Sequence, residues 1–568
     1  MRRFRRILIV LVIGLLLLWW LSPKGGPTVE PGSVLVLNIE GDYVEAAEPS
    51  LLSRLVGEER QPFAALLSDL RKAERDDRLA GVVLRIRGLQ IGWAKAQEIR
   101  DAIAQVSAAG RKTVAYLELA SLAANREYYV ASAAHEVVIS PAARAPVIGL
   151  AAEFMFLGGF WEIFGIDLEV ERIGKYKTFA DTFARKTMSD AHREMANSLL
   201  DSIDSQFVAG IAKSRGLTED FVRKAIDEAA MTPEEMRALD LIDAVRFEDE
   251  IIEGLGGGPV IEGDEYAQVD PASAGIKPVA QFALVYGSGP IVSGEGASSR
   301  SGAPVLASET VSQALVDAAE DDAIRAIIFR VDSPGGSALA SDVVWRATKR
   351  AGERGKPLIV SFSDVAASGG YYVSCGADAI VASPASVTGS IGVVVLRPVL
   401  KGLLDKLDIG FATLTRGVHA DLALTTEPLS DASRERLRAE VKSIYDLFVE
   451  RVADGRSLDR ARVDEIGQGR VWTGAQAAEI GLVDELGGLR AAARRAKIAA
   501  GIDPDADVAL VPYPRPLSLA EQVSETMRRV SVSTPLPLPK LARLAAEWLA
   551  SVPSETPALL PPFVFDIR

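Results

Sequence analysis

Two halves of this chain resemble each other, and this internal repeat constrains the fold more than any other feature of the sequence. Arg85 in "GVVLRIRG" matches Arg330 in "AIIFRVDSPGG", 245 residues later. The triplet Tyr-Tyr-Val at 128–130 recurs at 371–373, an offset of 243. Such a repeat is far longer than the roughly 20 to 50 residues of a solenoid unit. The sequence therefore predicts two similar domains in tandem.

Each half alternates apolar runs with amphipathic helical stretches. The first half contains "SVLVLNI", "GVVLRI", "KTVAYLEL" and "EVVIS", and the second contains "FALVYG", "AIIFRV", "KPLIVSFSD" and "DAIVAS". Continuous apolar runs suit strands buried on both faces, and their alternation with helices indicates βαβ units. We therefore predict an α/β fold with largely parallel sheets, and a longer helix near the end of each half, at 190–216 and 431–457.

Composition shifts divide the chain into five segments. The stretch 254–277 is rich in Gly, Pro and acidic residues, which is typical of a linker, and the last fifty residues are rich in Pro. We expect a basic tip and apolar anchor at 1–27, a first repeat at 28–253, the linker at 254–277, a second repeat at 278–510 and an extension at 511–568.

The N-terminus carries a signal for location. Four arginines within residues 2–6 precede an apolar run from Ile7 to Leu21 that ends in Trp19 and Trp20. A helix of this run would be about 22 Å long, somewhat short of the roughly 30 Å hydrocarbon core. The basic flank predicts a cytoplasmic N-terminus, and the tryptophans suit an interfacial belt. A retained transmembrane anchor is favoured, with a cleaved signal peptide as the alternative.

Charge and cysteine content exclude some classes of protein. The net charge is −14 and no long basic run follows the first six residues, so a nucleic-acid partner is not expected. Cys375 is the single cysteine, so no intrachain disulfide can form. We interpret it as a small buried residue, with a catalytic thiol as the alternative. The sequence holds no His/Cys cluster and no phosphate-binding G-x-x-x-x-G-K-[ST] motif, so neither metal nor nucleotide cofactor is expected.

A candidate nucleophile lies where an apolar strand runs into a helix. In "PLIVSFSDVAASGGYYV", Ser368 precedes Gly369 at the expected helix start. Backbone N–H groups at such a start suit an oxyanion, although a serine there is more often a helix N-cap. The "SPGG" corner, with Gly335 and Gly336, ends another predicted strand and could offer further N–H groups, or could be a structural turn.

Two kinds of general base remain open. A lysine can act only if burial or cationic neighbours lower its pKa towards neutrality, and the segment 171–190 offers Lys175, Lys177 and Lys186. The chain has three histidines, of which His419 is followed by Asp421, so a Ser-His-Asp arrangement is conceivable.

Together these motifs resemble the long, duplicated bacterial form of signal peptide peptidase A, a membrane-bound Ser–Lys protease. The matching blocks are "GKYKTFADTFARKTMSD", "FRVDSPGGS", "SDVAASGGYYVSCGAD" and "SPASVTGSIGV". The resemblance covers nearly the whole chain and implies a crotonase/Clp-protease-like fold in each repeat, which agrees with the βαβ pattern.

The resemblance also implies roles for individual residues. The nucleophile falls on Ser368, the lysine base on Lys177, and a serine that supports the lysine on Ser390. The oxyanion donors fall on Gly369 and on Gly335 or Gly336.

Comparison of the two halves supports this division of roles. At the repeat offset, Ser368 corresponds to Asn125, and Lys177 corresponds to Ala420. The "SPGG" corner corresponds to residues 88–90, which read Gly-Leu-Gln. Because each half keeps what the other lacks, we expect one composite site where the two domains meet.

The resemblance implies an endopeptidase that degrades cleaved signal peptides and other hydrophobic peptides in the inner membrane. It implies a single-pass protein with a cytoplasmic N-terminus, periplasmic catalytic domains, contact with the lipid bilayer and a homo-oligomer, a tetramer for the long form. Two alternatives stay open: a crotonase-like acyl-transfer enzyme and an inactive membrane scaffold.

Overall fold

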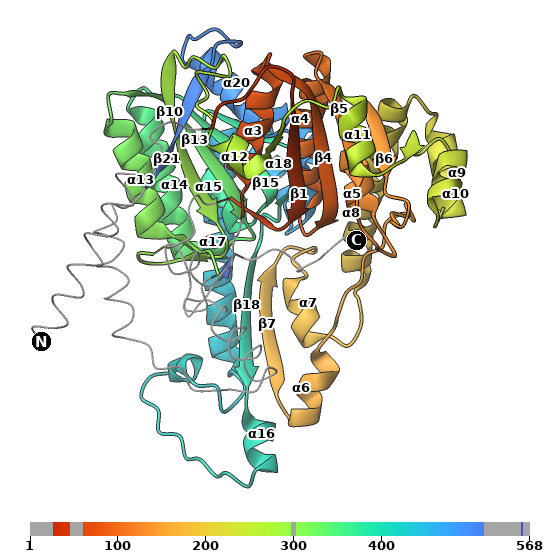
Figure 1. Ribbon diagram of the computed structural model, residues 1–568. Helices are drawn as coiled ribbons and strands as arrows, with labels where there is room; N and C mark the ends of the chain where they lie inside the picture. The colour runs from red at the N-terminus through yellow and green to blue at the C-terminus, as the bar shows by residue number, and fades with distance from the viewer. Residues whose placement is uncertain (1–26, 46–60, 297–302, 516–557, 560–568) are drawn as a thin grey trace, which may run out of the picture.

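The computed structural model describes residues 27–45, 61–296, 303–515 and 558–559 (Figure 1). The predicted basic tip and anchor at 1–27, apart from its last residue, and most of the predicted extension at 511–568 lie outside these ranges. Within the described residues, no helix has the length and apolar character needed to cross a bilayer.

The first half builds a six-stranded sheet in which every pair of neighbouring strands is parallel. In spatial order its strands are β8 (Ala244–Val245), β6 (Glu136–Ile139), β5 (Lys112–Leu117), β4 (Leu79–Leu89), β1 (Ser33–Gly41) and β9 (Val260–Glu262). The first five residues of β1 are all buried, as a strand covered on both faces requires.

The second half repeats this arrangement in an eight-stranded sheet. Its main order is β19 (Val471–Thr473), β17 (Val387–Gly389), β15 (Leu358–Ala367), β13 (Ile324–Ser333), β10 (Ala280–Ser288) and β21 (Val508–Tyr513), with β16 (Ala379–Ala382) beside β15 and β20 (Glu485–Leu486) beside β16. All its pairs are parallel except β17 with β19. The prediction of an α/β fold with largely parallel sheets is therefore confirmed.

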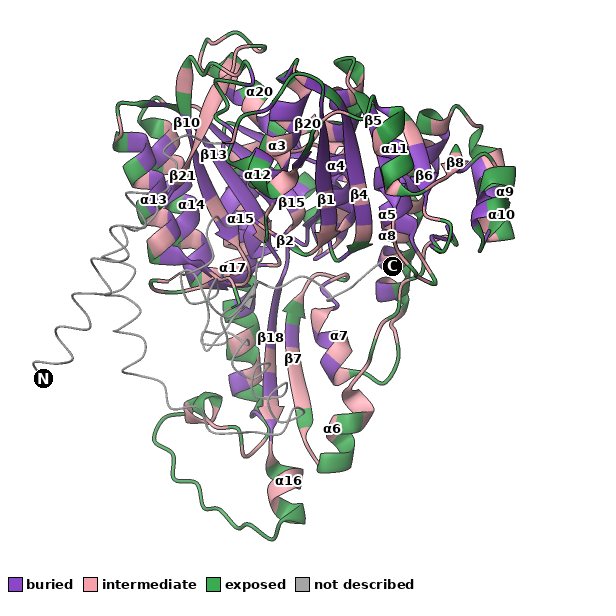
Figure 2. Cartoon of the chain, in the orientation of Figure 1, coloured by how far each residue is buried: buried purple, intermediate pink, exposed green. Residues whose placement is uncertain are grey.

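Helices pack against these sheets, so buried strands lie at the centre of each half (Figure 2). The helices of the first half are α3 (Phe63–Arg75), α4 (Trp93–Ala108), α5 (Asn125–Ala131), α6 (Gly158–Phe164), α7 (Phe179–Ala184), α8 (Asp190–Arg215), α9 (Glu219–Glu228), α10 (Pro233–Ala238), α11 (Glu248–Gly254) and α12 (Gly263–Ala267), of which α6 lies below the main body. In the second half they are α13 (Ser308–Glu320), α14 (Ala338–Glu353), α15 (Gly369–Ser374), α16 (Lys401–Lys406), α17 (Asp431–Arg456), α18 (Arg460–Ile466), α19 (Gly474–Glu479) and α20 (Leu489–Ala499), with a 3₁₀ turn at Ala420–Ala423.

The two long helices have matching starts. The Ser189 side chain accepts a hydrogen bond from the backbone of His192 at the start of α8, and Ser430 accepts one from Ser433 at the start of α17. Such caps satisfy N–H groups that have no partner inside the helix. The long helices predicted near the end of each half are therefore present.

A third sheet joins the two halves. Its order is β12 (Leu306–Ala307), β11 (Ile291–Val292), β14 (Gly336–Ser337), β22 (Ala558–Leu559), β18 (Val393–Val399) and β7 (Asp167–Ile173). Strand β7 of the first half pairs antiparallel with β18 of the second, and the two extend together below the main body (Figure 1). A separate two-stranded pair consists of β2 (Tyr43–Val44) and β3 (Gln61–Pro62).

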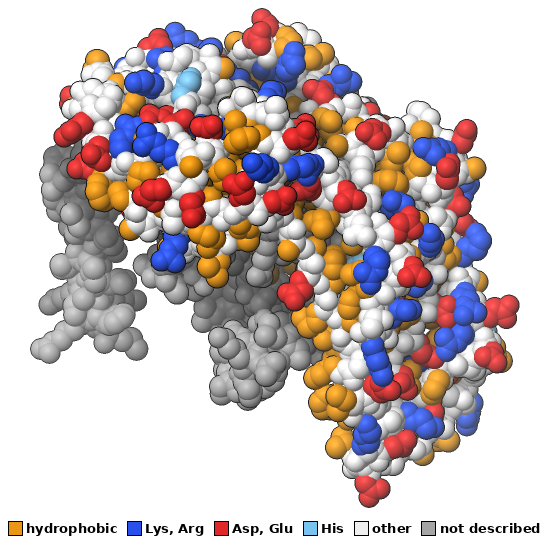
Figure 3. All heavy atoms as spheres, turned by 90° about the vertical axis from the view of Figure 1, so that its right-hand side faces the viewer, with side chains coloured by type: hydrophobic (Ala, Val, Ile, Leu, Met, Phe, Trp, Pro, Cys, Tyr) orange, Lys and Arg blue, Asp and Glu red, His pale blue; other side chains and the backbone are white. Residues whose placement is uncertain are grey.

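The predicted linker contains secondary structure. Strand β9 within it pairs with β1 and extends the first sheet, and α12 follows. The predicted boundary at 510 falls inside β21, which pairs with β10 at the edge of the second sheet. On the face shown in Figure 3, basic and acidic side chains are intermixed among apolar ones.

Candidate active site

Ser368 occupies a sharp connection between β15 and α15. Its backbone has φ 56° and ψ −114°, a conformation that is unfavourable for a residue with a Cβ. Ser368 stands at the N-cap position of α15, but its side chain makes no capping hydrogen bond to the helix. A strained serine between a strand and a helix has the geometry of a nucleophile elbow, although the sequence is not G-x-S-x-G.

Pairing between strands brings three predicted residues together. In the parallel β15–β17 pair, Ala367 is paired with Gly389. Ser368 directly follows Ala367 and Ser390 directly follows Gly389, so the two serines lie side by side. Val393 pairs with Ile173 in the β7–β18 pair, which carries the segment after β7 to the same place. Lys177 lies in that segment, so both halves contribute to one site within a single chain.

The Lys177 amine lies between the two serines. Its Nζ is 2.7 Å from Oγ of Ser368, 2.8 Å from Oγ of Ser390 and 2.9 Å from the Ser390 carbonyl oxygen. All three residues are completely buried. A neutral amine can donate two hydrogen bonds to Ser390 and accept one from the Ser368 hydroxyl, which fits these three contacts.

Burial sets the charge of this lysine. It lowers the pKa of Lys177 well below the ordinary value of 10.5, because a charged amine would lose its hydration. The site therefore favours the neutral amine, the form that can take a proton from a hydroxyl.

The "SPGG" corner packs against the start of α15. A Cβ atom on Gly369 would lie 3.1 Å from Cα of Gly335, and one on Gly370 would lie 2.6 Å from the Ser333 carbonyl oxygen. The N–H of Gly335 already donates to Oγ of Ser333, at 3.2 Å. Gly336 pairs with β11 on one side and with Leu559 of β22 on the other. Of the two corner glycines, Gly336 is thus the one whose main chain pairs with strands on both sides.

The alternative candidates lie elsewhere. Lys175 is exposed, its amine contacts the Tyr176 hydroxyl and Glu194, and these hydrogen bonds raise its pKa. His419 lies beside Ser433, 3.2 Å from its Oγ, at the start of α17. Of these candidates, Lys177 is the one whose amine lies within hydrogen-bond distance of the Ser368 hydroxyl.

The structure also shows the surroundings of Cys375 and of Asn125. Cys375 is buried, and burial raises the pKa of its thiol to about 12, which fits the interpretation as a small buried residue. Asn125, at the repeat equivalent of Ser368, receives a hydrogen bond from the Ile148 backbone and donates one to the Gly149 carbonyl. In the first half this position therefore holds a loop in place.

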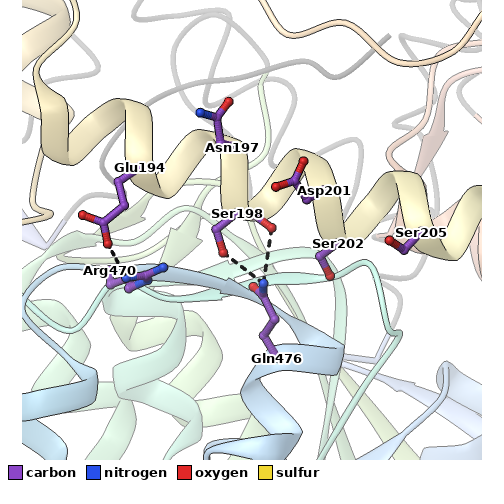
Figure 4. Close-up of a pocket in the computed structure, with 8 residues that line it drawn as sticks. All are labelled: Glu194, Asn197, Ser198, Asp201, Ser202, Ser205, Arg470 and Gln476. Carbon is purple, nitrogen blue, oxygen red and sulfur yellow. Dashed lines mark hydrogen bonds and ion pairs between the residues drawn. The ribbon is translucent and has the colours of Figure 1, made fainter.

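A surface pocket of about 560 Å³ lies between α8 and the segment 470–476 (Figure 4). In it Arg470 pairs with Glu194 at 3.0 Å, and Glu194 also accepts a hydrogen bond from the Tyr176 hydroxyl. Tyr176 directly precedes Lys177, so these contacts hold the segment that carries the lysine.

Gly469 is a site residue that the sequence analysis missed. Its backbone has φ 74°, and a Cβ atom there would lie 2.5 Å from the backbone nitrogen of Lys177. The N–H of Gly469 donates to the Ile391 carbonyl, one residue after Ser390. Only the glycine in "GQGR" hinted at it, and a glycine in a loop has many explanations.

Gly469→Ala should displace Lys177 and lower peptidase activity by about 100-fold, since a shift near 1 Å in a reacting group can cost that much. Gly501→Ala is the matched control, because Gly501 has φ 69° with no atom near the added Cβ. Both variants share the backbone strain, so a similar loss of activity in both would contradict the steric explanation. The measurement is kcat/KM for a hydrophobic peptide ester.

Comparison with known proteins places the chain in a family. Residues 106–256 and 350–503 each match Peptidase family S49, one match in each half. "Serine protease SPPA, chloroplastic" of Arabidopsis thaliana is 36% identical over 86% of this chain and 72% of its own length. "Protease 4" of Haemophilus influenzae is 28% identical over 82% of this chain and 78% of its own.

A shorter relative matches part of the chain. "Putative signal peptide peptidase SppA" of Enterococcus faecium is 38% identical over 30% of this chain and 49% of its own length. The predicted resemblance to the signal peptide peptidase A type is confirmed by these matches, and the chain belongs to Peptidase family S49 in a form with a duplicated peptidase domain.

Proposed function

We propose that this serine-type peptidase is an endopeptidase with a Ser–Lys dyad, in which Ser368 is the nucleophile and Lys177 the general base. The observation that carries the proposal is the 2.7 Å separation of the Lys177 amine from the Ser368 hydroxyl in a completely buried site. A buried neutral lysine at this distance can activate a serine without histidine.

The reaction follows from the positions of these groups. Lys177 takes the proton from Ser368, whose Oγ attacks the peptide carbonyl and forms a tetrahedral intermediate. The N–H groups of Gly369 and Gly336 stabilise its oxyanion. The protonated lysine then gives its proton to the leaving amine. Water, deprotonated by Lys177, releases the acyl group and restores Ser368. Ser390 accepts a hydrogen bond from the amine and orients it.

An extended peptide suits the position between β14 and β18 in the third sheet. The main chain of Ala558–Leu559 runs antiparallel to both β14 and β18 and fills the space between them. Strand addition of this kind recognises a peptide through its main chain and leaves specificity to side-chain pockets. This supports a peptide substrate over an acyl-CoA thioester, for which a crotonase-like enzyme would be built.

The natural substrates that we propose are cleaved signal peptides and other hydrophobic peptides. The printed name of the Enterococcus relative includes signal peptide peptidase. The apolar run Ile7–Leu21, outside the described residues, would anchor the chain in the inner membrane with the peptidase domains in the periplasm. We also propose a homo-oligomer, with a tetramer as the expected form.

A serine-directed fluorophosphonate tests the nucleophile. We expect one covalent adduct, located on Ser368 by peptide mass spectrometry, together with hydrolysis of a hydrophobic peptide ester. Ser368→Ala should lose the adduct. Ser374→Ala is the matched control in the same segment, because the Ser374 hydroxyl donates to the Gly370 carbonyl of its own helix, and it should keep the adduct. An adduct on another residue would refute the assignment of Ser368, and an unreactive wild-type protein would favour an inactive scaffold.

A further inference from the structure

A second lysine of the first half reaches into the second half near the site. Lys95 lies in α4 and is buried, with 6% of its surface exposed. Its Nζ is 2.7 Å from Oδ2 of Asp332 and 3.2 Å from Oδ2 of Asp364. Glu45 lies further away, at 3.6 Å. The mechanism above assigns none of these four residues a role.

The two aspartates belong to the strands that lead into the site. Asp332 is in β13, three residues before Gly335, and Asp364 is in β15, four residues before Ser368. Oδ1 of Asp332 accepts a hydrogen bond from the Val365 backbone at 3.1 Å, which links the ends of the two strands. Lys95 therefore holds together the segment that carries the oxyanion corner and the segment that carries the nucleophile.

Backbone contacts fix Lys95 itself. Asp364 accepts hydrogen bonds from the backbone N–H groups of Gly92, at 3.1 Å, and of Lys95, at 3.0 Å. These are the N–H groups at the start of α4, where a carboxylate is favourable. The N-terminus of α4 and the Lys95 side chain thus both bind the Asp364 carboxylate.

The positive charge of Lys95 offsets the negative charges of the two aspartates. Burial raises the pKa of Asp332, and the nearby Asp364 adds to this, whereas Lys95 opposes both. Although burial disfavours the lysine charge, Asp332, Asp364 and Glu45 together hold the Lys95 pKa well above 10.5. Without this cation, two partly buried carboxylates would face each other at the strand ends, and their repulsion would push the strands apart.

If the ends of β13 and β15 moved apart, the positions of Ser368 and the oxyanion donors would change. The Ser333–Gly336 corner is in van der Waals contact with Gly369 and Gly370, directly after Ser368. An oxyanion donor must lie within a few tenths of an ångström of its best position to be effective. We propose that Lys95 is a positioning residue for acyl transfer, which fixes the Gly335–Gly336 corner relative to Ser368. This inference rests on the proposed function.

The test uses the full chain and the rate per active site. Active sites are counted with the serine-directed fluorophosphonate, and kcat, KM and the Ki of a peptide aldehyde are measured for wild type, Lys95→Met and Lys112→Met. The aldehyde forms a hemiacetal whose oxygen needs the same corner. Lys112 is exposed at the start of β5 and serves as the control.

We expect Lys95→Met to lower kcat per titrated site by about 10- to 100-fold and to raise the aldehyde Ki by a similar factor, with KM little changed. Lys112→Met should match wild type. A Lys95→Met protein with fewer titratable sites but normal kcat per site would have only a structural defect, and that result would overturn the proposal.

A second variant keeps the test decisive if Lys95→Met folds poorly. Asp332→Asn keeps the side-chain volume and the Val365 hydrogen bond but loses the charged contact with Lys95, and kcat per site should fall about tenfold. The double variant should be no slower than the slower single variant, because Lys95 acts through Asp332. Normal kcat in Asp332→Asn, or additive losses, would overturn the proposal. Absence of a titratable Ser368 in wild type would instead overturn the proposed function, and this inference with it.

Discussion

Replacing Lys177 with methionine should reduce kcat/KM for a hydrophobic peptide ester by about 10³- to 10⁴-fold. The lysine is proposed both to deprotonate Ser368 and to protonate the leaving amine, and a positioned acid–base group contributes on this scale. Methionine has a similar length and no charge, so it fits the buried site without an unpaired polar group. The measurement is a rate profile across about pH 6 to 10, the range around the ordinary lysine pKa and below it.

The wild-type rate should rise with pH through the lowered pKa of Lys177 and then level, because only the neutral amine accepts the proton. Lys175→Met is the control, since Lys175 is an exposed lysine two residues away. It should keep both rate and profile. A Lys177→Met enzyme with more than a tenth of wild-type activity would exclude this lysine as the base.

The same lysine should affect stability with a defined sign. Its pKa is lower in the folded chain than the value near 10.4 of an unfolded lysine, so between these values the unfolded state binds a proton that the folded state does not. The free energy of unfolding contributed by Lys177 therefore rises with pH across that window and is lost as pH falls through it. Lys177→Met should lack this dependence and be more stable than wild type at neutral pH.

Replacing Arg330 with methionine should lower the free energy of unfolding by about 3 to 5 kcal/mol. Arg330 is completely buried, and its guanidinium lies 3.0 Å from Glu45 and 2.7 Å from Glu98, two residues of the first half. Burial alone would raise the pKa of Glu45, but Arg330 and Lys95 lower it to about 2. Removal of the arginine leaves two buried carboxylates without their main partner. An uncompensated buried charge is strongly destabilising.

Arg325→Met is the matched control, because Arg325 is an exposed arginine on the same strand, and its substitution should change stability by less than about 0.5 kcal/mol. Denaturant unfolding followed by circular dichroism measures both. If Arg330→Met loses less than about 1 kcal/mol, the carboxylates are neutral or solvated, and the network does not join the halves as described.

The buried strands and the long helices could be predicted from local sequence patterns. Apolar runs such as "SVLVLNI" form strands buried on both faces because their burial follows from composition and periodicity. The helices at Asp190–Arg215 and Asp431–Arg456 follow from amphipathic periodicity and serine caps. Comparison of the halves also indicated one site with a serine from one half and a lysine from the other, because each half lacks the counterpart.

Other features depend on contacts between residues far apart in sequence. In strand β7, charged residues largely alternate with apolar ones, and the strand pairs with β18. That pairing, rather than any local pattern, places Lys177 beside Ser390. Gly469 shows its role only where it touches Lys177.

Charged residues are the clearest case. Arg85 and Arg330 occupy equivalent strands, yet Arg85 is partly exposed beside Glu248, whereas Arg330 is buried between the halves. The sequence by itself determined the strands, the helices and the residue types of the site, because these depend on patterns over a few turns or strands. Tertiary structure alone decided which lysines and arginines lose their water, because desolvation and charge pairing depend on what the rest of the chain places around them.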